Sequence, residues 1–172
     1  MPKTIRFEDY PEFQPNLSPS DMFKAGIFGG GYFRDIFSSV TKKSYDGYKR
    51  ACRYKCLSKV PKELLAQTTD KDVTKNKYKC KVGMSLQYWE EHNWIHPSRP
   101  YGWVEWYCGF YDGIRTSDDQ RQIKRWLGIA GPKGRFKNRL INELAKRRKP
   151  KGDYTVLPKI RQILLTWGFQ IN

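Results

Sequence analysis

The sequence has no apolar run of the length that a membrane span or a signal peptide needs. No stretch of about 18 apolar residues occurs, although roughly that many are required to cross a bilayer. The first nine residues, Met1 to Asp9, carry charges where a signal peptide would have an apolar segment. We therefore expect a protein with no membrane partner that is not secreted, which leaves an intracellular location.

Histidine, cysteine and acidic residues are also scarce. Only two histidines, His92 and His96, are present, and Pro97 predicts that the helix ends before it can turn both toward a metal. The cysteines match no common zinc-ligand spacing, so we expect free thiols instead of disulfides or a zinc site. The four cysteines are Cys52, Cys56, Cys80 and Cys108. The sequence thus indicates no catalytic residue, no metal and no cofactor.

Aromatic residues, in contrast, are abundant. Six Trp, eleven Tyr and nine Phe in 172 residues are too many for a disordered chain. The length fits one domain. We predict a mainly α fold, with α+β as the alternative: a compact helical bundle over residues 18–172, preceded by an extended N-terminal arm over residues 1–17.

Local signals place several helices. Ser18 before Pro19, Ser85, and Ser117 in the capping-box pattern Ser-x-x-Gln each predict a helix start. Pro158 and Gly168 bound a last helix, whose outward face is expected to carry Lys159, Arg161 and Gln162. A central core helix is indicated by aromatic residues at i, i+3, i+4, i+7 and i+8, namely Trp103, Trp106, Tyr107, Phe110 and Tyr111.

Two segments predict other local structures. Alternation in Tyr78-Lys79-Cys80-Lys81-Val82 indicates a small strand or hairpin near residues 77–82. The triplet Gly29-Gly30-Gly31 is typical of a tight turn. A phosphate-cradling loop is the alternative, although no Gly-Lys-Ser/Thr follows it.

Positive charge is concentrated in two zones. Between Arg121 and Lys151 twelve Lys or Arg residues face one acid, Glu143, and between Lys42 and Lys81 thirteen face four acids. The local net charges of +11 and +9 together give +20, which exceeds the +16 of the whole chain, so the remaining residues are acidic by four charges. Such zoning predicts a polyanionic partner, with nucleic acid as the first candidate.

The first zone resembles a helix-turn-helix in outline, with a pair of helices expected over residues 117–149. The turn Gly131-Pro132-Lys133-Gly134-Arg135 combines a helix start with two cations, which suits a phosphate. Residues 42–81 would form a second contact surface. The candidate nucleic-acid-binding residues are Lys133, Gly134, Arg135, Lys137, Asn138, Arg139, Arg147, Arg148, Arg121, Lys124 and Arg125.

Other interpretations stay open. Exposed Trp rings could stack on unpaired bases, although the helical period of these rings favours the core. The basic surface could instead hold an acidic protein or the inside of a virion. A metal-dependent nuclease is the third hypothesis. Its carboxylates would come from Glu90, Glu91, Glu105, Asp112, Asp118 and Asp119.

Several runs of the sequence resemble a known family. They include Gly26-Ile27-Phe28-Gly29-Gly30, Pro100-Tyr101-Gly102-Trp103 and Ala130-Gly131-Pro132-Lys133-Gly134-Arg135-Phe136. The family is an uncharacterised one of small basic proteins met in large DNA viruses of algae and in some unicellular eukaryotes. The resemblance covers most of the chain and implies a viral or nuclear DNA setting, including a virion protein between capsid and genome. No activity accompanies it.

Overall fold

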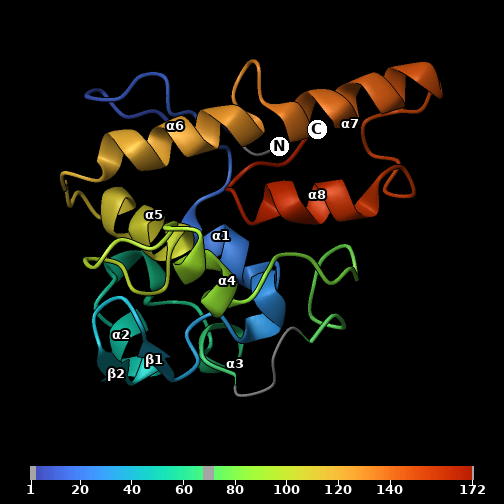
Figure 1. Ribbon diagram of the computed structural model, residues 1–172. Coiled ribbons are helices and arrows are strands. Elements are labelled where there is room, and N and C mark those ends of the chain that lie inside the picture. Colours follow the sequence, from blue (N-terminus) through green and yellow to red (C-terminus); the bar gives the residue numbers. More distant parts are fainter. Residues whose placement is uncertain (1–2, 68–71, 172) are drawn as a thin grey trace.

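The computed structural model describes residues 3–67 and 72–171. Helices make up most of the regular structure, and a two-stranded sheet completes it, so the mainly α class is confirmed (Figure 1). No helix in the described residues has the length and hydropathy of a membrane span. In chain order the elements are α1 (Pro19–Lys24), the 3-10 helix η1 (Ile27–Gly30), β1 (Ile36–Ser38), β2 (Lys43–Tyr45), α2 (Gly47–Ala51), the 3-10 helix η2 (Lys55–Leu57), α3 (Lys62–Leu65), α4 (Leu86–Glu91), α5 (Trp103–Tyr111), α6 (Asp119–Ala130), α7 (Arg135–Lys146) and α8 (Pro158–Leu165).

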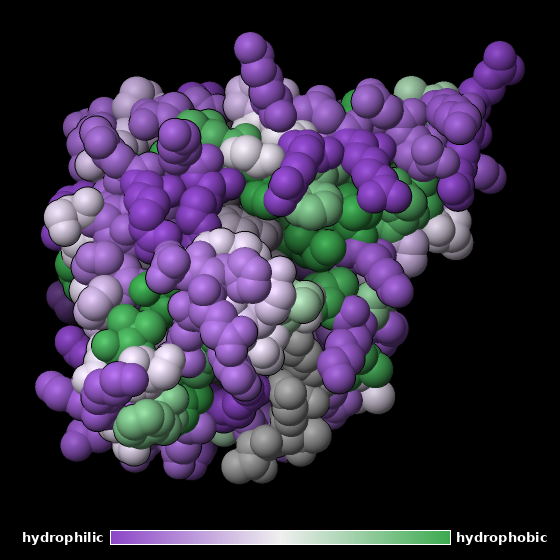
Figure 2. Space-filling model, in the orientation of Figure 1, coloured by the Kyte–Doolittle hydropathy of each residue, from purple (hydrophilic) through white to green (hydrophobic). Residues whose placement is uncertain are grey.

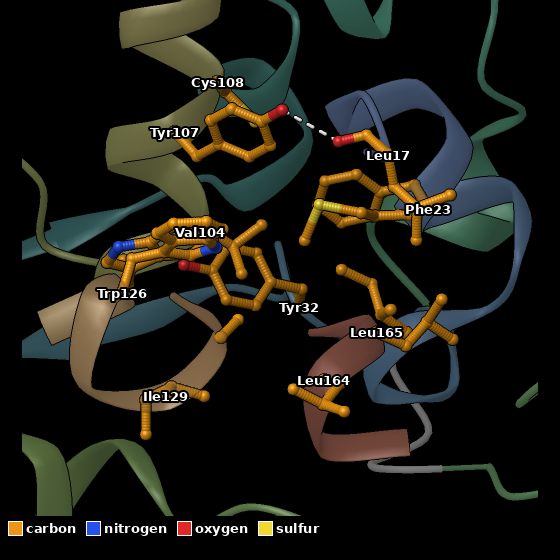
Figure 3. Packing of buried hydrophobic residues seen from close by; sticks show 14 of the residues in the cluster. Leu17, Phe23, Tyr32, Val104, Tyr107, Cys108, Trp126, Ile129, Leu164 and Leu165 are labelled. Atoms are coloured by element: carbon orange, nitrogen blue, oxygen red, sulfur yellow. Dashed lines mark hydrogen bonds between the residues drawn. The ribbon is translucent and has the colours of Figure 1, made fainter. Parts of the chain in front are cut away.

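Helix α5 lies at the centre of the molecule, as its aromatic pattern predicted. Every residue from Tyr101 to Phe110 is buried, so this part of the helix is covered on all sides and not only on one stripe. Tyr111, the last ring of the predicted stripe, is instead 40% exposed at the end of the helix. In the core the Tyr107 hydroxyl donates to the Leu17 carbonyl at 2.8 Å, which ties α5 to the N-terminal segment (Figure 3). Helices α6 and α7 form a layer outside α5 and α8 (Figure 1).

The predicted strand near 77–82 is wrong. The strands are β1 and β2, an antiparallel pair in which Ile36 faces Tyr45 and Ser38 faces Lys43. Residues 77–82 form neither helix nor strand because the chain turns at Lys79, where φ is +55°. The Asn76 side chain closes this turn by donating to the Cys80 carbonyl at 2.7 Å.

Two of the three serine caps are present. Ser18 Oγ accepts from the backbone N–H of Asp21, and Ser85 Oγ accepts from that of Tyr88, each at 3.1 Å. The third prediction is wrong in detail, because α6 begins at Asp119 and Ser117 does not cap it. The N-cap residue is Asp118, which makes no side-chain cap bond. Thr116 contacts this helix start instead: its backbone N–H and its hydroxyl donate to the Asp119 carboxylate at 2.9 and 3.0 Å.

The glycine-rich segment is a tight turn. Gly26 and Gly30 have φ values of +77° and +81°. A Cβ atom on Gly26 would lie 1.8 Å from the Lys75 carbonyl oxygen, and one on Gly30 would lie 2.4 Å from that of Glu63. The Gly29 N–H donates to the Asn76 side chain. Glycine is therefore required here by close backbone packing and not by a phosphate.

Helix α8 differs from its predicted amphipathic pattern. It begins at Pro158, and Gly168 follows it with a φ of +69°. Arg161 and Gln162, expected on the outward face, are 3% and 0% exposed. The Arg161 guanidinium donates to three backbone carbonyls, and Gln162 Oε1 accepts from the Tyr78 N–H. These long polar side chains are buried because they hydrogen-bond to backbone groups of neighbouring loops, which α8 thereby holds in place.

Candidate nucleic-acid interface

The outer face of α6 carries the first three candidate cations. Arg121, Lys124 and Arg125 stand at i, i+3 and i+4, while Ile123 and Trp126 point into the core at 2% exposure each. Lys124 is exposed and has no ion-pair partner in the described chain. Arg121 is engaged, because its guanidinium donates to both oxygens of Asp118 at 2.5 and 3.0 Å. Only part of this face therefore retains free positive charge.

Arg125 is the least solvated of these cations. One of its amino groups, Nη1, donates to the Trp94 carbonyl at 3.3 Å and to Gln122 Oε1 at 2.9 Å. Its guanidinium carbon lies 5.4 Å from the Trp94 ring centre and 5.3 Å from that of Trp167. Burial, followed by the neighbouring Arg121, lowers the pKa of Arg125 to about 10. It is still a cation at neutral pH, and it lacks a carboxylate of its own.

The turn between α6 and α7 is held by internal contacts. The Asn138 side chain donates to the carbonyls of Pro132 and Gly134 at 3.1 and 2.8 Å. Its amide nitrogen is thus engaged within the protein, so among the described contacts the side chain holds the turn. Lys133 is exposed in the same turn, and no side chain caps the start of α7 at Gly134.

Gly134→Ala is expected to lower the free energy of unfolding by about 1–3 kcal/mol, because overpacking at this close contact forces the backbone to shift. A Cβ atom there would lie 2.5 Å from the Ile129 carbonyl oxygen and 2.6 Å from the Ala130 nitrogen. Gly128→Ala is the control, since nothing lies within 4 Å of its Cβ position and alanine in a helix stabilises by roughly 0.5–1 kcal/mol. Urea unfolding of both variants measures the difference. Equal effects of the two substitutions would contradict this account of the turn.

Helix α7 presents a stripe of cations to solvent. Arg135, Arg139 and Lys146 recur with Asn142 at a spacing of four, three and four residues, and all four are exposed. Leu140 and Leu144 are buried on the other side of the helix at 1% and 4% exposure. We call Arg135, Arg139 and Lys146 the α7 stripe. It extends over roughly 16 Å at 1.5 Å per residue.

The remaining candidates of this zone differ in environment. Lys137 is half-buried over the Phe169 ring, 5.0 Å from its centre, and burial lowers its pKa. Arg147 pairs with Glu143 at 2.7 Å. Arg148 is exposed beyond the end of the helix. Of the predicted residues on and around α7, the exposed and uncompensated ones are thus Lys133, Arg135, Arg139 and Arg148.

Much of the second basic zone lies far from the first, although its last residues come close to it, because residues 82–84 line the same cavity wall as Arg125 and Arg135. Helices α2 and α3 and the β1–β2 sheet lie at the end of the molecule opposite α6 and α7 (Figure 1). Several of its cations serve the fold: Arg50 pairs with Glu105 at 2.6 Å, and Lys77 donates to Gln170 at 2.6 Å. Residues 68–71 of this zone lie outside the described residues.

The candidate acids and histidines have structural partners. Glu90 accepts from the Ser39 N–H, and Asp112 accepts from the N–H groups of Lys55 and Cys56. Helix α4 ends at Glu91, so His92 and His96 lie beyond it, each with one ring nitrogen near a local oxygen. The described residues hold no group of three His, Cys, Asp or Glu that could bind a metal. The four cysteines are free thiols.

The six tryptophans divide into two groups. Trp103, Trp106 and Trp126 are at most 6% exposed, and each donates its indole N–H to an internal oxygen. The other three, Trp89, Trp94 and Trp167, are half-buried, and their indole N–H groups donate to no described residue. Three of the six rings therefore belong to the core, as the period of Trp103 and Trp106 indicated, and the other three reach the surface.

That second group lines a cavity of about 320 Å³, a volume within the range of small-molecule sites. Its walls combine side chains of α4, α5, α6, α7 and α8 with residues 82–84 and Phe28. Arg125 of α6 and Arg135 of the α7 stripe are both wall residues. Figure 2 shows hydrophilic side chains over α6 and α7 and a hydrophobic strip over α8 beside them. The sequence did not predict the cavity, because its walls come from distant segments.

Comparison with protein families, curated proteins and solved structures found no match to this chain. Its function is therefore inferred from its own geometry.

Proposed function

We propose that this protein binds nucleic acid through the α7 stripe and the neighbouring Lys133. One observation carries the proposal: Arg135, Arg139 and Lys146 are exposed on one face of one helix without a carboxylate partner in the described chain. Repulsion among like charges on one face destabilises the free protein, and a row of phosphates relieves it. Arginine suits this role because its planar group binds phosphate oxygens in pairs.

The dimensions of α7 are compatible with a nucleic-acid backbone. Its 12 residues extend over about 18 Å, and a helix of this kind fits the major groove of a DNA duplex. A single strand could follow the same stripe. We favour DNA over RNA, because the resemblance to a family met in large DNA viruses of algae and in some unicellular eukaryotes implies a viral or nuclear DNA setting.

Replacing the three stripe residues by glutamine is expected to weaken binding and to flatten its salt dependence. Each neutralised phosphate adds about 0.9 to the slope of log K against log salt for a duplex and about 0.7 for a single strand. In the triple variant the slope should therefore be smaller by just under 3 for a duplex and by about 2 for a single strand. Fluorescence anisotropy with labelled single and double strands of DNA and RNA, at several salt concentrations, measures both quantities.

The matched control removes three exposed cations outside both basic zones. Lys3, Arg6 and Lys24 are replaced by glutamine in one variant, which changes the net charge equally and should leave the slope nearly unchanged. Equal losses in both triple variants would mean a diffuse charge effect and would contradict the stripe. If the protein binds no nucleic acid but co-purifies with an acidic protein or a capsid after nuclease treatment, the interaction-protein alternative holds instead.

A further inference from the structure

The cavity beside the α7 stripe has the features of a ligand site and not of a packing defect. Five half-buried aromatic side chains form much of its wall, contributed by η1, α4, the loop after α4, α7 and the segment after α8. They are Phe28, Trp89, Trp94, Phe136 and Trp167. Rings in this number are usually buried completely, because each removes a large apolar area from water. Here they keep one side accessible, so the cavity offers flat apolar surfaces to a flat ligand.

The polar groups of the wall define the ligand further. Within the described residues Arg125 donates hydrogen bonds through Nη1 alone, so Nε and Nη2 have no partner there. The indole N–H groups of Trp89, Trp94 and Trp167 also donate to no described residue. The wall is thus rich in donors and carries positive charge from Arg125 and Arg135. A quaternary ammonium group, the usual guest of an aromatic cage, would be repelled. A flat ring that bears hydrogen-bond acceptors is favoured.

The cavity also lies where the proposed backbone site begins. Arg135 is both the first residue of the α7 stripe and a wall residue of the cavity. A strand whose phosphates follow the stripe would therefore bring a nucleotide to the mouth of the cavity. A base paired inside a duplex could not enter, because it is stacked and its acceptor edge is occupied.

We propose that the cavity takes an unpaired nucleobase from a strand bound along the α7 stripe. The base stacks on the aromatic wall, and its acceptor edge meets the free donors of Arg125. This inference rests on the proposed nucleic-acid binding and makes it more specific: the preferred ligand is a single strand, or a duplex with an extruded base.

Two oligonucleotides test the inference with the full chain. One is a labelled DNA strand of about 12 nucleotides, within the range of roughly 4–16 nucleotides that single-strand sites cover. The other has the same length and backbone but lacks all bases. Both strands can bind the α7 stripe through their phosphates, whereas only the first has a base that can enter the cavity. A stacked base contributes enough that roughly 5- to 140-fold tighter binding of the base-carrying strand is expected.

Three variants locate the effect. Trp94→Ala removes a wall ring but keeps the carbonyl to which Arg125 donates, and Ile163→Phe fills the cavity without removing an aromatic wall. Each substitution should abolish the difference in affinity between the two strands and leave the affinity for the base-free strand unchanged. Phe37→Ala, at a ring that is 61% exposed and does not line the cavity, should preserve the difference.

The outcomes separate the two proposals. If the intact protein binds both strands equally, the cavity does not take a base, although backbone binding stands. The same conclusion follows if Trp94→Ala and Ile163→Phe both retain the difference. If neither strand binds, the inference about the cavity fails, and the measurement with duplexes then decides whether the α7 stripe binds nucleic acid at all. Binding of a trimethyllysine peptide that Trp94→Ala abolishes, without any preference for the base-carrying strand, would assign the cavity to a protein partner and overturn the inference.

Discussion

Replacing Phe13 by alanine is expected to lower the free energy of unfolding by about 3–5 kcal/mol, the cost of removing a large ring from a rigid core. Phe13 is 0% exposed although it lies in a segment without helix or strand. Six aromatic rings surround it at centroid distances between 5.1 and 6.2 Å. They belong to Phe7, Trp103, Trp106, Tyr107, Phe110 and Trp126.

Urea unfolding followed by tryptophan fluorescence measures this loss. The control is Phe37→Ala, which removes the same side chain from a position that is 61% exposed, and its effect should stay within about 0.5 kcal/mol. A loss below about 1 kcal/mol for Phe13→Ala, near the average of all substitutions, would show that the N-terminal segment is not part of the core.

The effect should extend to the candidate site. Phe13 packs edge-on against Trp126 of α6 at 5.1 Å, and the indole N–H of Trp126 donates to the Trp167 carbonyl at 2.9 Å. Trp167 in turn lines the cavity beside Arg125. Loosening Phe13 therefore weakens the support of the wall, and binding of the base-carrying strand should fall more than binding of the base-free strand.

Elements that depend on a few adjacent residues could be predicted from the sequence. Ser18 with Pro19, and Ser85, define helix starts through hydrogen bonds to a residue three positions away, so the necessary information is local. The start of α6 was misplaced by a similarly local competition: the predicted pair of Ser117 and Gln120 does not form, and Thr116 donates to Asp119 instead. Boundaries of this kind shift easily by one or two residues.

The sheet could not be predicted in the same way. Strands β1 and β2 have three residues each, too few to show an alternating pattern. Residues 77–82 do alternate, but the Asn76 side chain, which also accepts from the distant Gly29 N–H, turns the chain there. A contact between segments 47 positions apart leaves no periodic signal in either of them, so the pattern of side chains was misleading.

The candidate site was predictable in charge but not in detail. Counting residues identified the zone from Arg121 to Lys151, whereas tertiary contacts decide which cations remain free. Arg121 and Arg147 pair with nearby acids, and Asn138 holds the turn. The cavity has no sequence signature, because its walls combine residues from Phe28 to Trp167. The half-buried state of Trp94, in contrast to Trp103, emerges only from the folded chain.

The largest electrostatic effect on stability is expected at Glu105, a carboxylate in the first turn of α5. Its side chain is fully buried. One oxygen accepts from Arg50 Nε at 2.6 Å and from the Tyr54 hydroxyl at 2.5 Å, and the other accepts from the Tyr101 N–H at 3.1 Å. Burial, followed by the charge of Glu105, raises the pKa of Tyr54 and keeps its hydroxyl protonated as a donor. The carboxylate thus joins α2, the chain before η2 and the start of α5.

Glu105→Ala is expected to lower the free energy of unfolding by about 3–5 kcal/mol, because Arg50, with a side chain only 13% exposed, would remain as a buried cation without a counter-ion. The double variant Arg50→Met with Glu105→Leu removes both charges. Its loss in free energy of unfolding should be clearly smaller than the sum of the losses of Arg50→Met alone and Glu105→Leu alone. Glu143→Ala breaks the exposed pair with Arg147 and should cost at most about 1 kcal/mol. Urea unfolding of these variants at neutral pH gives the comparison. Additive losses at Arg50 and Glu105 would mean that the pair is not coupled, and that the two residues stabilise α2 and α5 separately.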